Sequence, residues 1–159
     1  MAEDNQAEKQ FSIQKLYVKD VSFETPNSPM IFTQQWEPKV EVNLASNAQT
    51  LQENLYEISL TVTVTVKVED KTAYLVEVCQ AGIFSISGFE ENELSPMIGS
   101  FCPNILFPYV REAISDIVNK GGFPPMLLAP VNFDALYMQH LQQLQEQQGN
   151  APAAGGKLN

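Results

Sequence analysis

Few side chains in this sequence could perform chemistry. The single histidine, His140, is the one candidate general base by residue type. It falls on the apolar stripe of a glutamine-rich segment, where a surface or structural histidine is the simpler interpretation. No Gly-rich phosphate loop, GxSxG or HExxH motif is present. We therefore expect a protein that binds rather than catalyses and that uses no cofactor.

Neither the acidic residues nor the cysteines predict a metal site. Glu90, Glu91 and Glu93 could ligate calcium, but a solvated helix start is the simpler interpretation. Cys79 and Cys102 form no CxxC pair, and with one histidine they are too few ligands for zinc. They could form a disulfide, although two free thiols are favoured in a cytosolic chain. We expect no bound metal.

Charge and hydropathy narrow the class of partner. The chain has 19 acidic and 9 basic residues, a net charge of −10, which argues against nucleic acid or an anionic membrane and favours a basic protein. No apolar run approaches the ~18 residues of a membrane helix. The first ten residues are acidic and polar, unlike a signal peptide. We expect a cytoplasmic protein that does not insert into a membrane.

The stretch LYEISLTVTVTVKV, residues 55–68, organises the rest of the chain. Apolar and polar residues alternate without a break from Ile58 to Val68, as in a half-buried antiparallel strand. At about 3.4 Å per residue these positions span roughly 37 Å, about twice the common strand length. A strand of this length predicts a wide apolar sheet face that needs cover.

Alternating residues predict three more strands, at 11–23, 39–44 and 72–82. Residues 45–54 read as a polar loop, and the charged turn at 69–71 makes a hairpin of the two strands around it. Short links favour a meander, although the proline-containing connection 24–38 could cross over. The prediction is an α+β fold with a four-stranded antiparallel sheet.

Apolar pairs recurring every four residues predict a long helix over 104–120 that ends at Gly121-Gly122. Pro108 within it implies a kink or a later start. A short helix is expected near 91–98, and Asn132 would cap a last, glutamine-rich helix. We divide the chain into a disordered segment 1–10, a single domain 11–144 and a flexible tail 145–159.

The predicted helices leave part of the apolar sheet face uncovered. One helix covers a strip only ~10 Å wide. A second subunit, another partner or the last helix must cover the remainder. An exposed apolar area of this kind usually marks an interaction site, although contacts between subunits could bury all of it.

Several long blocks carry a family likeness: KLYVKDVSFETPN (15–27), TAYLVEV (72–78), AGIFSISG (81–88), FCPNILFPYVRE (101–112) and APVNFDALYMQHLQQ (129–143). They closely resemble the SecB family of bacterial protein-export chaperones, and the resemblance runs over about 11–144. It implies a homotetramer, a dimer of dimers, in which the long helices pack between dimers. The interface residues would be Ile105, Tyr109, Ala113, Ile114 and Ile117.

The resemblance also implies an activity. The family binds unfolded secretory precursor proteins in the cytosol, without ATP, and delivers them to the SecA motor ATPase for export across the inner membrane. From the apolar surface we expect a client-binding groove made of Trp36, Val40, Val42, Leu44, Ile58, Leu60, Phe133, Leu136, Tyr137 and Leu141. Core packing is an equally good interpretation of Ile58 and Leu60, and a tryptophan in a connection, such as Trp36, is more often a core anchor than a ligand contact.

The family's acidic docking surface for the basic, zinc-bearing tail of SecA maps onto Asp20, Glu24, Leu75 and Glu77. Leu75 and Glu77 fall on one face of their strand, as a flat acidic patch with an apolar centre requires. The family often ends in an acidic tail that also touches SecA. Here the end is rich in Gln, Ala and Gly and contains Lys157, which weakens the prediction of that second contact.

A protein of another class is the alternative. An adaptor would use its apolar face only for self-assembly and for one fixed partner, and it would show no affinity for diverse denatured proteins. An enzyme is a remote third reading, because it would need a titrating site that the sequence does not contain.

Overall fold

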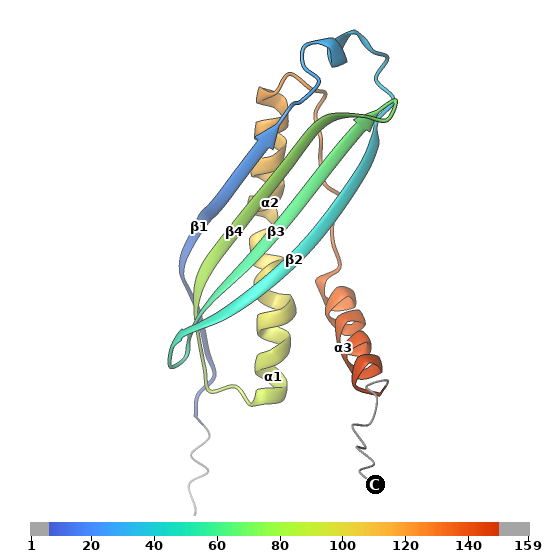
Figure 1. The fold of residues 1–159 in the computed structure, drawn as a ribbon. Coiled ribbons are helices and arrows are strands. Elements are labelled where there is room, and N and C mark those ends of the chain that lie inside the picture. The colour runs from blue at the N-terminus through green and yellow to red at the C-terminus, as the bar shows by residue number, and fades with distance from the viewer. Residues whose placement is uncertain (1–6, 150–159) are drawn as a thin grey trace, which may run out of the picture.

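Four long antiparallel strands form a sheet in the computed structural model, which describes residues 7–149 (Figure 1). They are β1 (Gln10–Glu24), β2 (Lys39–Gln52), β3 (Leu55–Val68) and β4 (Lys71–Ser87). The strand order is β1-β4-β3-β2. The chain therefore crosses from one edge of the sheet to the other after β1, through a connection that includes the 3-10 turn η1 (Met30–Thr33), and then runs as a meander. The predicted four-stranded α+β fold is confirmed.

The alternation in β3 decides which face of the sheet is buried. Its apolar residues from Ile58 to Val68 are all buried, whereas the threonines between them face the other side and are half-buried. Val64 pairs with Val42 of β2 and Val76 of β4, so the apolar layer continues across three strands. The turn Glu69-Asp70 has positive φ at both residues, as a two-residue hairpin requires.

Two strands are longer than the sequence predicted. β2 continues through the expected polar loop to Gln52, because its backbone pairs with β3 whatever its side chains are, for example Gln49 with Glu57. β4 continues past residue 82 to Ser87 because β1 and β3 pair with it on both sides. The polar residues of β2 led to the prediction of a loop. In an edge strand such as β2, polar side chains are compatible with a strand because both faces can be exposed to water.

The helical region is continuous where two separate helices were predicted. α1 (Glu91–Pro96), the π-helical turn η2 (Met97–Phe101) and α2 (Cys102–Lys120) follow one another without a gap. The later start that Pro108 implied is wrong. Both Pro108 and Asn104, whose carbonyl loses its helical partner, are exposed, so water can satisfy that carbonyl.

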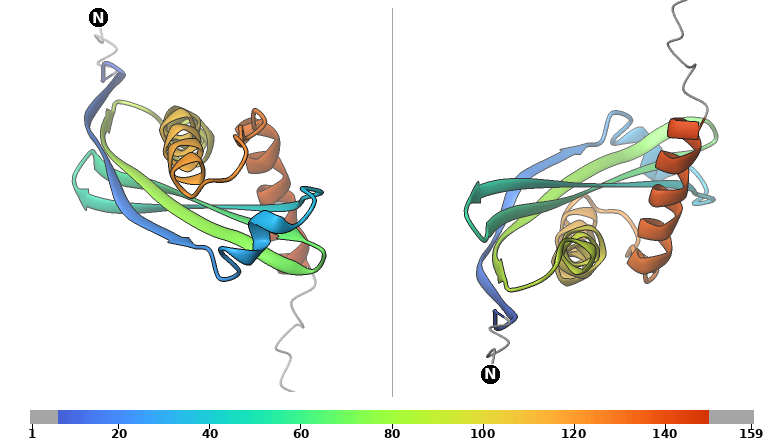
Figure 2. Two further views of the ribbon diagram at one scale, coloured as in Figure 1. Left: turned by 90° about the horizontal axis from the view of Figure 1, so that it is seen from above. Right: turned by 90° about the horizontal axis from the view of Figure 1, so that it is seen from below.

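α2 lies against one face of the sheet, over β3 and β4 (Figures 1 and 2). Leu106, Val110, Ile114 and Val118, spaced four residues apart, are fully buried in that contact. After an extended segment, α3 (Phe133–Gly149) lies beside the β2 edge (Figure 1). This helix passes the predicted domain end at residue 144. The outer parts of both predicted tails, 1–6 and 150–159, lie outside the described residues.

Candidate functional site

A groove of about 830 Å³ runs between β2, α1 and α3. Leu44 of β2 and Leu60 of β3 form one side, and Leu94 and Ile98 form its floor. The other side is the stripe of α3 residues spaced three or four apart: Phe133, Leu136, Tyr137, Leu141 and Leu144. Amide side chains such as Asn47 and Gln143 line the rim. The groove therefore offers an apolar interior with hydrogen-bonding groups at its edge.

Six of the predicted client-binding residues line this groove: Leu44, Leu60, Phe133, Leu136, Tyr137 and Leu141. Ile58 does not, because it is fully buried in the core and offers no surface. Val40 and Val42 lie further along β2 on the same face as Leu44, and they are 49% and 40% exposed. Leu60 is as deeply buried, at 1% exposure, so it lies beneath the groove as a core residue. The structure thus groups most of the predicted residues and assigns Ile58 and Leu60 to the core.

Trp36 belongs to an aromatic cluster at the other end of the sheet. Phe123, which follows α2, is buried at its centre, with ring centroids 5.9 Å from Trp36, 5.1 Å from Phe32 and 4.8 Å from Tyr74. Phe32 remains 50% exposed. Burial raises the pKa of Tyr74 to about 12. The sequence analysis missed Phe32 and Phe123, although both stand in proline- and aromatic-rich segments that hinted at a packed connection.

Within residues 7–149, the side-chain hydrogen bonds of α3 are confined to its first turns. Asn132 caps the helix, its side-chain oxygen accepting from the backbone amide of Ala135 at 3.0 Å. The Ser100 hydroxyl donates to the Asp134 carboxylate. The Tyr137 and Ser95 hydroxyl oxygens lie 2.6 Å apart. We call the contacts Ser95–Tyr137 and Ser100–Asp134 the α3 anchor.

Close packing supports the α3 anchor. The ring of Tyr137 lies so close to Gly99 that a Cβ atom there would be 2.5 Å from it, closer than real Cβ contacts allow. Phe133 meets Phe107 of α2 edge to face, at 5.7 Å between ring centroids. Beyond Leu141 the helix is exposed throughout its described length. One wall of the groove is therefore fastened at one end only.

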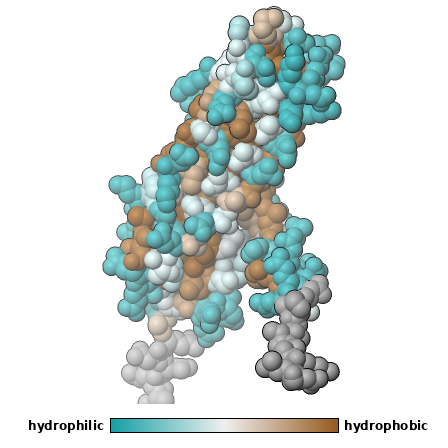
Figure 3. All heavy atoms as spheres, in the orientation of Figure 1, coloured by the Kyte–Doolittle hydropathy of each residue, from teal (hydrophilic) through white to brown (hydrophobic). Residues whose placement is uncertain are grey.

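The opposite face of the sheet carries the predicted docking residues. Glu24 pairs with Leu75, Ser22 with Glu77 and Asp20 with Cys79, so β1 and β4 bring Asp20, Glu24, Leu75 and Glu77 together. Asp20 and Glu24 are exposed, and Leu75 and Glu77 are half-buried. No helix of the described residues covers this outer face (Figure 1). It is a mixture of hydrophilic and hydrophobic residues rather than a continuous apolar surface (Figure 3).

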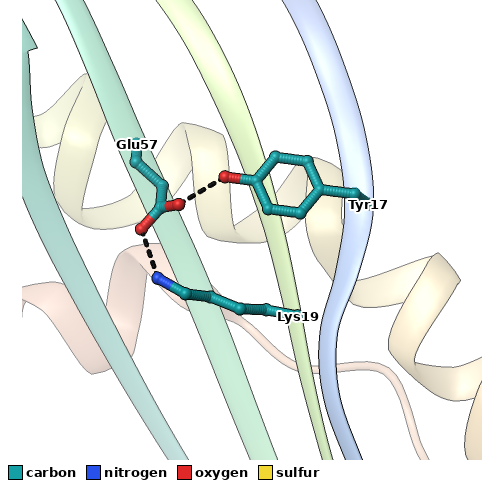
Figure 4. Close-up of polar contacts among 3 residues, drawn as sticks. All are labelled: Tyr17, Lys19 and Glu57. Carbon is teal, nitrogen blue, oxygen red and sulfur yellow. Dashed lines mark hydrogen bonds and ion pairs between the residues drawn. The ribbon is translucent and has the colours of Figure 1, made fainter.

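A polar network on the same outer face was not predicted. Tyr17 and Lys19 of β1 reach across β4 to Glu57 of β3 (Figure 4). The Tyr17 hydroxyl donates to one carboxylate oxygen, and the Lys19 ammonium lies 2.7 Å from the other. Lys19 and then Tyr17 lower the pKa of Glu57, and Glu57 raises the pKa of Lys19. Burial, followed by Glu57, raises the pKa of Tyr17 to about 12.

The predicted interface stripe on α2 divides into two sets. Ile114 points into the sheet and is fully buried within the single chain, so the prediction that it faces another subunit is not supported. Ile105, Ala113 and Ile117 are half-buried, and Tyr109 is 48% exposed. These four residues flank the buried stripe. Apolar surface also remains on β1 at Ile13, Val18 and Val21.

The reactive groups considered first lie in different parts of the fold. His140 is exposed on the groove rim. Cys79 is half-buried and Cys102 is buried, both as free thiols, and burial raises the pKa of Cys102 to about 12. Within 7–149 no three His, Cys, Asp or Glu residues gather where they could hold a metal ion. No helix in that range is both long and apolar enough to cross a membrane.

Comparison with known proteins connects these surfaces to a family. Residues 4–144 match the family described as preprotein translocase subunit SecB. The chain is 73% identical over 148 residues to the protein-export protein SecB of Methylococcus capsulatus, covering 92% of this chain and 96% of that protein. It is 59% identical over 138 residues to that of Nitrosococcus oceani, covering 86% and 84%.

A solved structure shares the fold. The SecB-like chaperone Rv1957 of Mycobacterium tuberculosis, in complex with a ChAD peptide from the HigA1 antitoxin Rv1956, aligns with a TM-score of 0.64. The two chains are 13% identical, and the alignment covers 76% of this chain and 90% of that one. At this identity the similarity concerns the fold alone.

Proposed function

This chain belongs to the SecB family of protein-export chaperones, and from that premise we propose that its apolar groove holds unfolded precursor proteins before export. The similar mycobacterial chaperone was solved with a peptide bound, which supports a peptide-binding use of the fold. Binding alone suffices for this task, so we propose that the chain acts without ATP and without a catalytic step.

The observation that carries the proposal is a groove lined by apolar side chains that are open to water. Leu136 is 43% exposed there, beside Tyr137 and Leu141 of the same stripe. Apolar burial is not directional and gives only ~25 cal/mol per Å², so such a groove binds many sequences weakly. A protein that has folded has already buried its apolar segments, so clients that fold slowly are the ones retained.

The proposed client surface has two parts. Leu44, Leu60 and the α3 stripe form the groove, and Val40 and Val42 extend it along β2 toward Trp36. The aromatic cluster around Phe123 forms the second part. Ile58 is excluded because it is buried, and Leu60, at 1% exposure, lies beneath the groove and offers no surface to a client. We propose that residues 11–144 form the functional unit.

We propose that Asp20, Glu24, Leu75 and Glu77 bind the basic tail of the SecA motor. Three carboxylates around one apolar side chain suit a basic partner, as does the net charge of −10. These residues occupy the outer face, whereas the groove opens on the other side of the sheet at its β2 edge. The two surfaces do not overlap, so client and motor can bind together before transfer.

We propose that the chain forms a homotetramer, a dimer of dimers, and that it works in the cytoplasm. The uncovered apolar surface on α2 and β1 supports self-assembly. Ile105, Tyr109, Ala113 and Ile117 on α2 would pack between dimers. Four grooves in one assembly would bind one long client at several points. Avidity would then exceed the affinity of any single groove.

Light scattering tests this function directly. We expect the purified protein to have a mass near four times 17.7 kDa and to suppress aggregation when a denatured secretory precursor is diluted into it. A tetramer that leaves aggregation unchanged would favour the adaptor instead. A monomer would contradict the proposal that Ile105, Tyr109, Ala113 and Ile117 of α2 pack between subunits.

A further inference from the structure

A bulge in β1 brings a cation beside the acidic docking surface. Val18 pairs with Gln80 and Asp20 pairs with Cys79, which leaves Lys19 as the extra residue between them. In an unbroken strand Lys19 and Asp20 would point to opposite faces. Here Asp20 shares the outer face with Cys79, and Lys19 reaches Glu57 on the same face.

The positive charge of Lys19 could neutralise part of the negative charge of the docking surface. Asp20, Glu24 and Glu77 form no ion pair within the described residues. An ammonium group resting on Asp20 would neutralise one of these three carboxylates and would compete with a basic partner for it. Lys19 adjoins Asp20 in the sequence and reaches over the same face, which makes Asp20 an alternative partner for its ammonium group.

The ion pair with Glu57 holds the Lys19 ammonium group away from Asp20. Its carboxylate lies 2.7 Å from the Lys19 ammonium on the far side of β4, and its other oxygen accepts a hydrogen bond from Tyr17 (Figure 4). The Glu57 side chain is mostly buried, whereas Asp20 is exposed, so the pair with Glu57 is the less screened of the two alternatives. The Tyr17 side chain can reach Glu57 across β4 because the residue opposite it, Ala81, has only a small methyl side chain.

We propose that Glu57 is a positioning residue for the docking surface: it draws Lys19 away from Asp20 and so leaves Asp20 available to a basic partner. The inference rests on the proposed docking of SecA to Asp20, Glu24, Leu75 and Glu77. It adds a residue outside that surface, 37 positions from Asp20 along the chain, that controls how strongly the surface attracts its partner.

The test is a double-mutant cycle read out as the affinity of purified SecA for the assembled full-length chain. In Glu57→Gln the released Lys19 can pair with Asp20, and we expect affinity to fall roughly fivefold, within the range of an exposed ion pair. Adding Lys19→Gln should return affinity to within about twofold of the parent, because no cation then remains to compete. Lys19→Gln alone should change it by no more than about twofold.

Lys67→Gln is the matched control, because Lys67 is an exposed lysine of β3 with no ion pair to Glu57. It makes the same change in net charge, so in the Glu57→Gln background it should not restore affinity. Light scattering should show an unchanged assembly for every variant. A purely structural role for Glu57 would not be rescued by removing Lys19.

Each outcome of these measurements either supports or overturns the proposed role of Glu57. A loss in Glu57→Gln that Lys19→Gln does not reverse, or parent-like affinity of Glu57→Gln, overturns the inference. Asp20→Asn and Glu77→Gln test the docking surface separately. If both leave SecA affinity unchanged, the proposed docking site fails and the inference fails with it. If they weaken binding while Glu57→Gln does not, only the role of Glu57 is lost.

Discussion

The two faces of one sheet are built in different ways. On the α2 side, β3 and β4 are buried under a helix, and the apolar layer reaches water at both sheet edges. At the β1 edge it does so through Val18 and Val21, and at the β2 edge it borders the groove whose other wall is α3. On the outer face no described helix intervenes, and acids, threonines and the Tyr17–Lys19–Glu57 network lie on paired strands, with a bulge in β1 at Lys19. One surface has a wall that is anchored at its first turns, and the other lies entirely on paired strands.

This difference matches two kinds of partner. An apolar wall that can move accepts side chains of different size, because burial has no directional requirement. Charges fixed on a rigid sheet recognise one arrangement of opposite charges. The proposed function, in which many clients bind weakly and one motor binds selectively, therefore requires only a single domain. Substitutions on one face should therefore leave binding at the other face intact.

Reversing a charge on the outer face should separate the two activities most strongly. Glu77→Lys places a like charge opposite a basic partner, and we expect SecA affinity to fall roughly 30-fold or more. Suppression of client aggregation should stay at the parent level because Glu77 is remote from the groove. Isothermal titration and light scattering measure the two quantities. A loss of both would mean that the faces are not independent.

Displacing the α3 wall should have the next largest effect. Gly99→Val would push the Tyr137 ring out of its contact and break the α3 anchor, and we expect client affinity to fall about tenfold. Gly149→Ala is the control, because nothing lies within 4 Å of a Cβ atom at that position. Fluorescence anisotropy of a labelled unfolded client measures the change. Unaltered binding by Gly99→Val would remove α3 from the site.

Removing one apolar contact from the groove should have a smaller effect. Leu136→Ser should weaken client binding by about fivefold, in line with ~1 kcal/mol of lost burial. Leu51, near the end of β2 and outside the groove, is equally exposed at 43%, so Leu51→Ser controls for lost apolar surface in general. Equal losses for the two variants would speak against a defined groove. Leu44→Ser should also preserve the tetramer, and dissociation would assign Leu44 to the core.

The smallest effect concerns the pH dependence of stability. Because Lys19 and Tyr17 lower the pKa of Glu57, the unfolded chain binds more protons at this group, and its stabilisation is lost as pH falls below the ordinary glutamate value of 4.5. Urea unfolding between pH 3 and pH 6 should therefore show a shallower fall in stability for Glu57→Gln than for the parent. Identical slopes would show that the network does not persist in solution.

The patterns that the sequence analysis read correctly are local ones. Period two in 58–68 predicted the buried face of β3, and pairs every four residues predicted α2. One error arose where backbone pairing extended a strand through polar residues, as in β2 beyond Leu44. Another arose where two adjacent apolar residues were both candidates for the core and only one is buried. Ile114 is buried while Ala113 is only half-buried, and the stripe alone did not separate them.

The sequence by itself determined which segments form strands and helices, though not all their ends, and the family likeness, because periodicity and motifs are properties of residues close together in the chain. Only the tertiary structure decided which distant side chains meet. It set Leu44 across a groove from Leu136, and it let Lys19 reach Glu57 across β4. The register of the sheet and a one-residue bulge determine these side-chain contacts. Both arise from backbone pairing, which cannot be predicted from the pattern of side chains.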